Sequence, residues 1–428
     1  SPASRGTAAP APRRSPVILF AGPSETDRMP IPTPFHERTA PLCRSFRWKD
    51  WSGYAAVCSY DTSHEREYFA FRETAGLLDV TPLFKYEVRG PDAGRLLARM
   101  MTRDVSKMKV GRVMYSCWSD DAGRVVDDGT VARLDEEHYR VTAADPSLHW
   151  LEDCGRGMDV RLEDSSDRLA ALALQGPTSR DVLVAAGATE AASLRFFGIT
   201  RATIDGLPVW ISRTGYTGDL GYEVWCENRG ALRLWDALMA AGAPYGIEPA
   251  GLDALDVARI EAGFVLLGID YFSSPKVVLE ARKSTPDELG FGWMFDPAKD
   301  TRAGFVGREA ILRERARKPA WHLAGLEVSW EELEALYAGF QLPPSLPATA
   351  SRAGLPVYAD DGRQVGKATS HTWSPILKKY LVIASVLDGY QTHGTRLDLE
   401  HTVEFERRKV GATVVPTPFY DPERKRKP

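Results

Sequence analysis

The amino-acid sequence predicts an α+β fold that ends in a β-barrel-like domain. A strand, a Gly-Pro turn and a helix follow one another from residue 86, and the same order returns from residue 169. After residue 321 the chain changes to short β-rich runs. With 428 residues and 43% hydrophobic content, the chain is long enough for two or three domains.

The two strand-turn-helix units carry the clearest patterns. In YEVRGPDAGRLLARMM, which begins at Tyr86, an alternating strand is followed by a Gly-Pro-Asp turn that caps a helix with apolar residues at helical spacing. In LAALALQGPTSRDVL, which begins at Leu169, an apolar strand passes through Gly-Pro into a second helix. We therefore expect two similar α+β modules.

The remaining elements are expected in chain order. Residues 111–117 and 124–133 read as strands joined by a hairpin turn at 120–123. Residues 252–268, LDALDVARIEAGFVLLG, read as an amphipathic helix that ends at a glycine. A charged, irregular connection follows, and then the β-rich segment with a turn at 359–362.

These patterns divide the chain into four parts. We expect a flexible tail over residues 1–40, two intertwined α+β modules over 41–320, a barrel-like domain over 321–421 and a second flexible tail over 422–428. The first sixteen residues lack acidic groups, as transit peptides do, but their prolines oppose a targeting helix, which favours a plain tail. Whether this N-terminal tail is native or a targeting segment stays open.

Composition excludes several classes of function. The net charge is -4, from 54 basic and 58 acidic residues mixed along the chain, so nucleic acid is not an expected partner. The five cysteines form no CxxC pair, which argues against a zinc or other metal site and against a disulfide framework. Apolar runs are far shorter than the roughly 20 residues of a membrane span. A cytoplasmic protein without membrane contact is expected.

Three short motifs carry the functional information through their order and spacing. They are GRVMYSCWSDDAGRVVDD at 111–128, RTGYTGDLGYE at 213–223 and SPILKK at 374–379. Together they resemble the glycine-cleavage T-protein (aminomethyltransferase) family, and the likeness extends over residues 45 to 420. The resemblance implies a three-domain cloverleaf, with two α/β modules around a central folate channel and a C-terminal β-barrel domain, and it implies tetrahydrofolate as the cofactor.

The resemblance also implies roles for individual residues. Asp128 would be the catalytic carboxylate, and Glu223 would accept hydrogen bonds from the 2-amino and N3 groups of the pterin. Tyr216 and Tyr115 would pack near the folate. Phe196 and Phe197 would form an aromatic pair near the pterin. Arg259 and Glu261 match the Arg-x-Glu spacing of the family helix, with an internal ion pair as the alternative to ligand contact, and Trp293 would belong to the scaffold.

Other interpretations of the same residues stay open. Asp127 and Asp128 can cap the end of a strand, and RTGYTGDLGYE can form a glycine-rich hairpin without a ligand. The two phenylalanines fit core packing as well as ligand contact. The order of the blocks favours the functional interpretation of the carboxylates.

The sequence departs from the family on the side that would receive the one-carbon donor. Pro82 replaces a family histidine and Leu255 replaces a family arginine, so this side loses charge and becomes more apolar. Residues 269–289 form a longer loop than in the family, which could reshape the donor entrance. We therefore expect the same cofactor but a different donor.

The leading hypothesis is a tetrahydrofolate-dependent demethylase that moves a methyl group from a small-molecule donor to N5 of tetrahydrofolate. One alternative is an aminomethyltransferase that acts on a lipoyl carrier protein and gives 5,10-methylenetetrahydrofolate and ammonia. Another is a non-catalytic folate-binding maintenance protein, although the Lys-Gly-Cys-Tyr motif of such relatives is absent. The identity of the donor, the product and the oligomeric state are beyond what these motifs predict.

Overall fold

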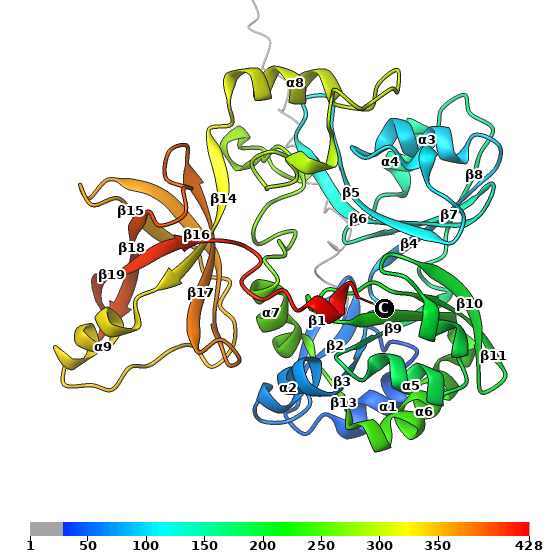
Figure 1. Cartoon of the computed structure of the whole chain (residues 1–428), viewed down its shortest axis with the longest axis horizontal. Coiled ribbons are helices and arrows are strands. Elements are labelled where there is room, and N and C mark those ends of the chain that lie inside the picture. The colour runs from blue at the N-terminus through cyan, green and yellow to red at the C-terminus, as the bar shows by residue number, and fades with distance from the viewer. Residues whose placement is uncertain (1–28, 428) are drawn as a thin grey trace, which may run out of the picture.

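The computed structural model describes residues 29–427. The first sixteen residues, from which we expected a tail, lie outside the described residues. The described chain forms three lobes that meet centrally, namely two α+β modules and a barrel (Figure 1). The predicted α+β class with a C-terminal barrel is confirmed.

The first module is built on a five-stranded antiparallel sheet with the order β5-β6-β7-β4-β8. Gly90 ends its first strand with φ +124°, a conformation that turns the chain into the first helix of the module. The elements are β4 (Phe84–Arg89), α3 (Ala93–Met100), β5 (Arg112–Ser119), β6 (Val125–Asp135), β7 (His138–Ala143), α4 (Leu148–Cys154) and β8 (Arg161–Asp164).

The second module is built on a six-stranded sheet with the order β10-β11-β12-β9-β3-β13. Its elements are α2 (Glu65–Glu73), β3 (Ala75–Asp79), β9 (Leu169–Gln175), α5 (Ser179–Ala185), β10 (Ile199–Ile204), β11 (Leu207–Ser212), β12 (Gly221–Glu227), α6 (Ala231–Gly242), β13 (Ile247–Pro249) and α7 (Leu252–Glu261). The strands β3 and β9 pair, although the whole first module lies between them in the chain.

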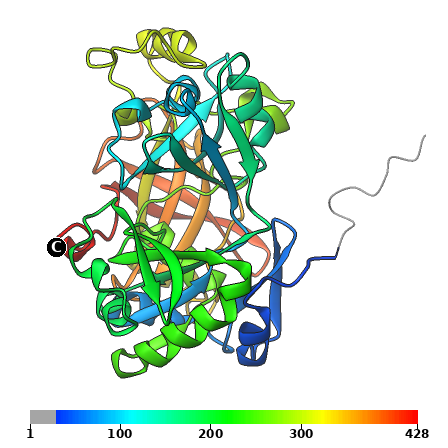
Figure 2. The same ribbon diagram turned by 90° about the vertical axis from the view of Figure 1, so that its right-hand side faces the viewer.

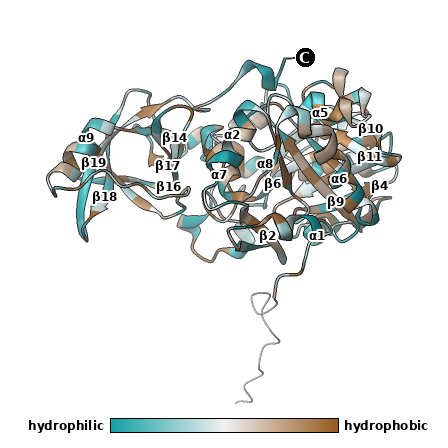
Figure 3. Cartoon of the chain, turned by 90° about the horizontal axis from the view of Figure 1, so that it is seen from below, coloured by the Kyte–Doolittle hydropathy of each residue, from teal (hydrophilic) through white to brown (hydrophobic). Residues whose placement is uncertain are grey.

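The core of the second module follows from the apolar character of β9. Every residue of this strand is buried, and Leu172 and Leu174 pack with residues of α5 and α6. Figure 3 shows the strand in the brown of hydrophobic residues. A strand covered on both faces needs an unbroken apolar run, which explains why LAALALQ does not alternate.

Helix α7 is shorter than predicted. We expected a helix over 252–268, but it ends at Glu261, and Gly263 has φ +67°. The amides of Gly263 and Phe264 still bond to carbonyls of the last turn, and the chain then leaves the helical path. Residues 264–268 are apolar because they line a cavity and a small core cluster, and not because they continue the helix.

The third lobe is a closed six-stranded barrel with the order β14-β17-β16-β15-β18-β19. Closure leaves no free sheet edge, and the interior is packed with aliphatic side chains. Its elements are β14 (Trp321–Val328), α9 (Trp330–Ala338), β15 (Leu355–Tyr358), β16 (Gln364–Ser374), β17 (Lys379–Leu387), β18 (Arg396–Val403) and β19 (Glu406–Val415). Helix α8 (Arg308–Arg317) precedes it, and Figure 2 shows the barrel behind the two modules.

Both ends of the described chain are more ordered than we expected. In the segment assigned to the N-terminal tail, α1 (His36–Thr39) forms and Phe35 is buried against Trp235. A hairpin of β1 (Arg47–Trp51) and β2 (Tyr54–Ser59) follows. At the other end, the short helix η10 (Glu423–Lys425) docks on the second module. Throughout residues 29–427, each helix is too short or too polar to cross a bilayer.

Candidate functional site

A cavity of about 2160 Å³ lies where the three lobes meet. Single small-molecule sites commonly occupy about 300–1,000 Å³, so this space is large enough for an extended ligand together with a second small molecule. All six residues singled out from the sequence line it, and they come from both modules: Tyr115, Asp128, Phe196, Phe197, Tyr216 and Glu223.

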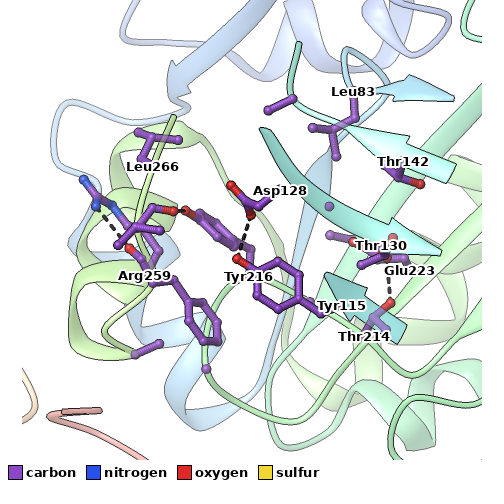
Figure 4. Close-up of a pocket in the computed structure, with 18 of the residues that line it drawn as sticks. Leu83, Tyr115, Asp128, Thr130, Thr142, Thr214, Tyr216, Glu223, Arg259 and Leu266 are labelled. Atoms are coloured by element: carbon purple, nitrogen blue, oxygen red, sulfur yellow. Dashed lines mark hydrogen bonds between the residues drawn. The ribbon is translucent and has the colours of Figure 1, made fainter. Parts of the chain in front are cut away.

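The hairpin of β5 and β6 positions Asp128. This residue pairs with Cys117 across the two strands, and its side chain faces the cavity. Its neighbour Asp127 points to the opposite face of β6 and is fully buried, because successive side chains of a strand alternate. Figure 4 shows Asp128 and Tyr115 pointing toward one another.

Two tyrosines hold the carboxylate of Asp128. The hydroxyl of Tyr115 donates to Oδ2 at 2.7 Å, and the hydroxyl of Tyr271 donates to Oδ1. Burial raises the pKa of Asp128 above its ordinary value, and both hydroxyl donors oppose that rise by stabilising the charged form. A carboxylate with a raised proton affinity is a better proton acceptor than an exposed aspartate.

Asp127 has a structural role, which the sequence allowed for both Asp127 and Asp128. Its carboxylate accepts hydrogen bonds from the backbone amides of Asp128 at 2.8 Å, Ala144 at 3.1 Å and Asp145 at 3.0 Å. These bonds tie β6 to the end of β7. Burial and the neighbouring Asp128 raise the pKa of Asp127 well above its ordinary value. Asp127 therefore supports the hairpin, while Asp128 faces the cavity.

Glu223 presents a second carboxylate to the cavity from β12. It accepts a hydrogen bond from the hydroxyl of Thr214 at 2.6 Å (Figure 4) and one from the hydroxyl of Ser212 at 3.4 Å. Burial raises its pKa, and the two hydroxyls oppose the rise. Within residues 29–427 Glu223 takes part in no salt bridge, so its charge is incompletely neutralised by the protein.

The loop between β11 and β12 carries Tyr216 into the cavity. The ring of Tyr216 stacks on Phe264 with centroids 5.4 Å apart and planes inclined by 26°, and its hydroxyl donates to the carbonyl of Val265. Gln175 braces this loop from beneath, since its amide donates to the carbonyl of Thr214 at 3.2 Å. The glycine-rich sequence thus forms a braced loop beside the cavity.

Phe196 and Phe197 lie at the junction of the two sheets. Their rings meet edge to face with centroids 4.7 Å apart. The carbonyl of Phe197 accepts from Val113 on β5, and its amide donates to Arg213 after β11. Phe197 has φ +55°, an uncommon conformation for a bulky residue, which the bonds on either side hold in place.

Arg259 and Glu261 on α7 form internal ion pairs, the alternative to ligand contact. Arg259 pairs with Asp256 and Asp270, each at a distance below 3 Å. Glu261 pairs with Arg72 at 2.6 Å in a fully buried setting. Held in this way, Arg259 braces one wall of the cavity.

Sequence reasoning missed Tyr271 and misjudged Trp293. Tyr271 lies in the segment 269–289, whose extra length was the only available signal. Trp293, expected in the scaffold, lines the cavity with 61% of its surface exposed, and the guanidinium of Arg103 lies 5.2 Å from its ring centre. Within the described range, no three His, Cys, Asp or Glu side chains gather as metal ligands do.

The apolar positions near the sequence departures also line the cavity. Val80 and Leu83, which flank Pro82, belong to its wall, as does Leu255. This part of the cavity wall is therefore apolar, while Lys49, Asp256 and Arg352 bring charged groups to the same cavity.

Comparison with protein families finds two matching domains. The GCVT N-terminal domain matches residues 34–299, and the glycine cleavage T-protein C-terminal barrel domain matches residues 337–421. The crystal structure of glycine cleavage system aminomethyltransferase T from Bartonella henselae is similar with a TM-score of 0.77 at 23% identity, covering 91% of this chain and 98% of that one. This likeness establishes the fold.

Two curated relatives differ in how much of them this chain spans. A trimethylamine-oxide aldolase of Ruegeria pomeroyi is 33% identical over 417 residues, which make up 94% of this chain and 49% of the aldolase. An aminomethyltransferase of a Geobacillus species is 33% identical over 376 residues, which make up 87% of this chain and 94% of that protein. The chain therefore spans about half of the aldolase and nearly all of the aminomethyltransferase.

Proposed function

The chain belongs to the folate-dependent glycine cleavage T-protein family, and on that premise we propose that it transfers a methyl group from a small-molecule donor to N5 of tetrahydrofolate. One observation carries the proposal. A single cavity contains Glu223, a carboxylate without a salt bridge in the described chain, and Asp128, a carboxylate held by two hydroxyls. An aliphatic wall lines the same cavity.

The residues present fit a folate. The pterin edge offers two adjacent N–H donors, which match the two oxygens of the Glu223 carboxylate. Phe196, Phe197 and Tyr216 offer ring surfaces for a flat heterocycle and an aminobenzoyl group. We propose that Glu223 fixes the pterin and that the aromatic side chains orient the rest of the molecule.

The proposed chemistry requires one proton acceptor. Tetrahydrofolate supplies the nucleophilic N5 nitrogen that accepts the one-carbon unit. Asp128 takes up the proton that N5 loses as the new C–N bond forms, while the bond between the methyl carbon and the donor heteroatom breaks and its electron pair stays with that heteroatom. A cationic donor leaves as a neutral molecule, and a neutral donor takes the proton from Asp128 as it leaves. The braced walls exclude water and hold the reactants in register.

The donor is proposed to be a methylated small molecule. The aliphatic wall formed by Val80, Leu83 and Leu255 supports this class, because it removes the charge that the family arginine would supply. The aldolase relative is named for trimethylamine oxide, which makes methylated amines and their oxides the first group to test.

The test is an isotope-transfer assay. We would incubate the protein with tetrahydrofolate and a panel of [methyl-13C] amines, amine oxides, sulfonium compounds and aromatic methyl ethers, and follow labelled 5-methyltetrahydrofolate by mass spectrometry. Wild type is expected to form the labelled product from one class, and Asp128→Asn is expected to lose about 100- to 10,000-fold in rate. Folate binding without label transfer from any donor would contradict the demethylase proposal.

The alternative candidate is an aminomethyltransferase that acts on a lipoyl carrier protein. It is favoured by the extent of the match, which covers 94% of the Geobacillus aminomethyltransferase. Lipoyl carrier loaded with an aminomethyl group distinguishes the two, because only this alternative predicts ammonia and 5,10-methylenetetrahydrofolate. Release of ammonia at catalytic rates would replace the demethylase proposal.

A further inference from the structure

The segment 269–289 contributes directly to the site. We propose that Tyr271 is a positioning residue that holds Asp128 ionised and correctly oriented for proton uptake, an inference that rests on the proposed function. Tyr271 contacts Asp128 and acts through it. No feature of the motifs assigns it a role.

The first observation is how firmly the start of this segment is anchored. The side chain of Asp270 is fully buried. It accepts hydrogen bonds from Arg259 at 2.7 Å, from Ser370 at 2.7 Å and from the backbone amide of Leu266 at 2.8 Å. Residue 270 is thereby fixed to both α7 and β16 of the barrel. Such a saturated network places the next residue in one position.

The second observation is that the segment is tied to the first module at two further points near Asp128. Lys276 pairs with Asp145 at 2.8 Å, and the amide of Val125 donates to the carbonyl of Ser284 at 2.8 Å. Asp145 is the residue whose amide bonds to Asp127. The segment is therefore tied to the start of β6 and to the residues after β7, and Tyr271 contacts Asp128 in this same region.

The third observation is the division of the two carboxylate oxygens. Tyr271 donates to Oδ1 and Tyr115 donates to Oδ2, so each oxygen carries one fixed donor and keeps its remaining lone pairs for other partners. The ring of Tyr271 is 1% exposed and packs with Cys117 and Phe291. A tyrosine held this firmly restricts the rotation of the carboxylate.

The groups around Asp128 leave the hydroxyls of Tyr115 and Tyr271 to stabilise its ionised form. The titratable groups that face it are Tyr115 and Cys117 from β5, Asp127 from β6, Tyr216 from the loop after β11, and Tyr271. All of them are neutral or acidic. Hydroxyl donors are the groups that stabilise the charged form, and removing one shifts Asp128 toward its protonated, inactive form.

The experiment compares Tyr271→Phe with wild type in the absence of folate. Aspartate labelled with 13C at its carboxyl would be followed by NMR across pH, with Asp128→Asn to assign the signal. Loss of one hydrogen bond to a charged group is expected to raise the titration midpoint of Asp128 by about one to two pH units. Tyr115→Phe should act in the same direction, and Tyr358→Phe in the barrel serves as the matched control without effect.

A second readout separates positioning from scaffolding. In the transfer assay, the acid limb of the rate profile of Tyr271→Phe should move to higher pH by the same interval. Its calorimetric affinity for tetrahydrofolate at pH 8 should stay within about threefold of wild type. A threefold change is about 0.6 kcal/mol, the size expected of a substitution that removes no contact with the ligand. If Tyr271→Phe does not fold, 3-fluorotyrosine at position 271 replaces it. This stronger donor should lower the midpoint.

Each outcome decides the inference. A midpoint for Asp128 that is unchanged in Tyr271→Phe, or unchanged with 3-fluorotyrosine, overturns the role of Tyr271. A shifted titration midpoint of Asp128 in a protein that transfers no methyl group supports the coupling of Tyr271 to Asp128 and contradicts the demethylase proposal. The two failures are therefore distinguishable.

Discussion

At the scale of single residues, the adjacent carboxyls of Asp127 and Asp128 show how a strand separates two tasks. Alternation sends Asp127 to backbone amides and Asp128 to the cavity. Their shared burial raises both pKa values. Under the proposed function, the inward residue stabilises the hairpin and the outward residue accepts the proton.

The raised pKa of Asp128 leads to a pH prediction. Under the proposed function the carboxylate form accepts the proton, so activity is present above the folded pKa and is lost as pH falls through it. Because burial raises this pKa, the acid limb should lie above the value near 3.9 of an ordinary aspartate. The pH dependence of the transfer rate at saturating substrates measures it. An acid limb at or below that ordinary value would contradict proton uptake by Asp128.

At the scale of elements, Gly215 in the loop between β11 and β12 and Gly221 at the start of β12 pack closely on the side chain of Gln175. A Cβ added at Gly221 would lie 2.2 Å from Oε1 of Gln175. Gln175 has little freedom to retreat, because its side chain bonds to Thr214, Thr217 and Tyr222. The loop that carries Tyr216 is therefore packed too tightly for a methyl group.

Gly221→Ala is accordingly expected to lower the free energy of unfolding by about 1–3 kcal/mol. In a Gln175→Ala background the same change should cost much less, because the clashing amide is gone. Urea unfolding of the four proteins of this cycle measures the coupling. Equal costs of Gly221→Ala in both backgrounds would show that Gln175 is not the obstacle.

Elements with a local pattern were predictable, and those fixed by distant partners were not. The two strand-turn-helix units and the barrel follow from periodicity and turn residues, and the six candidate site residues share one cavity. The extent of α7 was overestimated, because apolar residues beyond Gly263 face a cavity rather than a helix stripe. Tyr271 was missed because its partner Asp128 lies 143 residues away.

At the scale of the whole molecule, the chain end links the barrel to the second module. Arg424 pairs with the buried Asp219 at 2.7 Å, and the carbonyls of Arg424 and Lys425 accept hydrogen bonds from Arg213. Lys425 and Arg426 line the cavity. A run of basic residues that resembled a tail thus closes one side of the site, through a contact 205 residues apart in sequence.

Arg424→Ala tests this closure. Loss of the partly exposed pair should lower stability by about 1–2 kcal/mol. It should also weaken tetrahydrofolate binding, because the chain end no longer closes the cavity. Arg426→Ala is the matched control for stability, since within residues 29–427 the salt bridge of Arg426 is to the exposed Asp421. Thermal unfolding and calorimetry measure both effects, and equal stability of the two variants would refute a docked chain end.

The meeting of three lobes around one cavity makes folate binding the central claim of this account. The most direct measurement is a calorimetric titration of tetrahydrofolate into wild type, Glu223→Gln and the surface control Glu331→Gln. We predict one site in wild type and in the control, and a dissociation constant about 10- to 100-fold higher in Glu223→Gln, as expected when a hydrogen bond to a charged group is lost. Absence of binding to wild type, or equal affinity in all three proteins, would contradict the account.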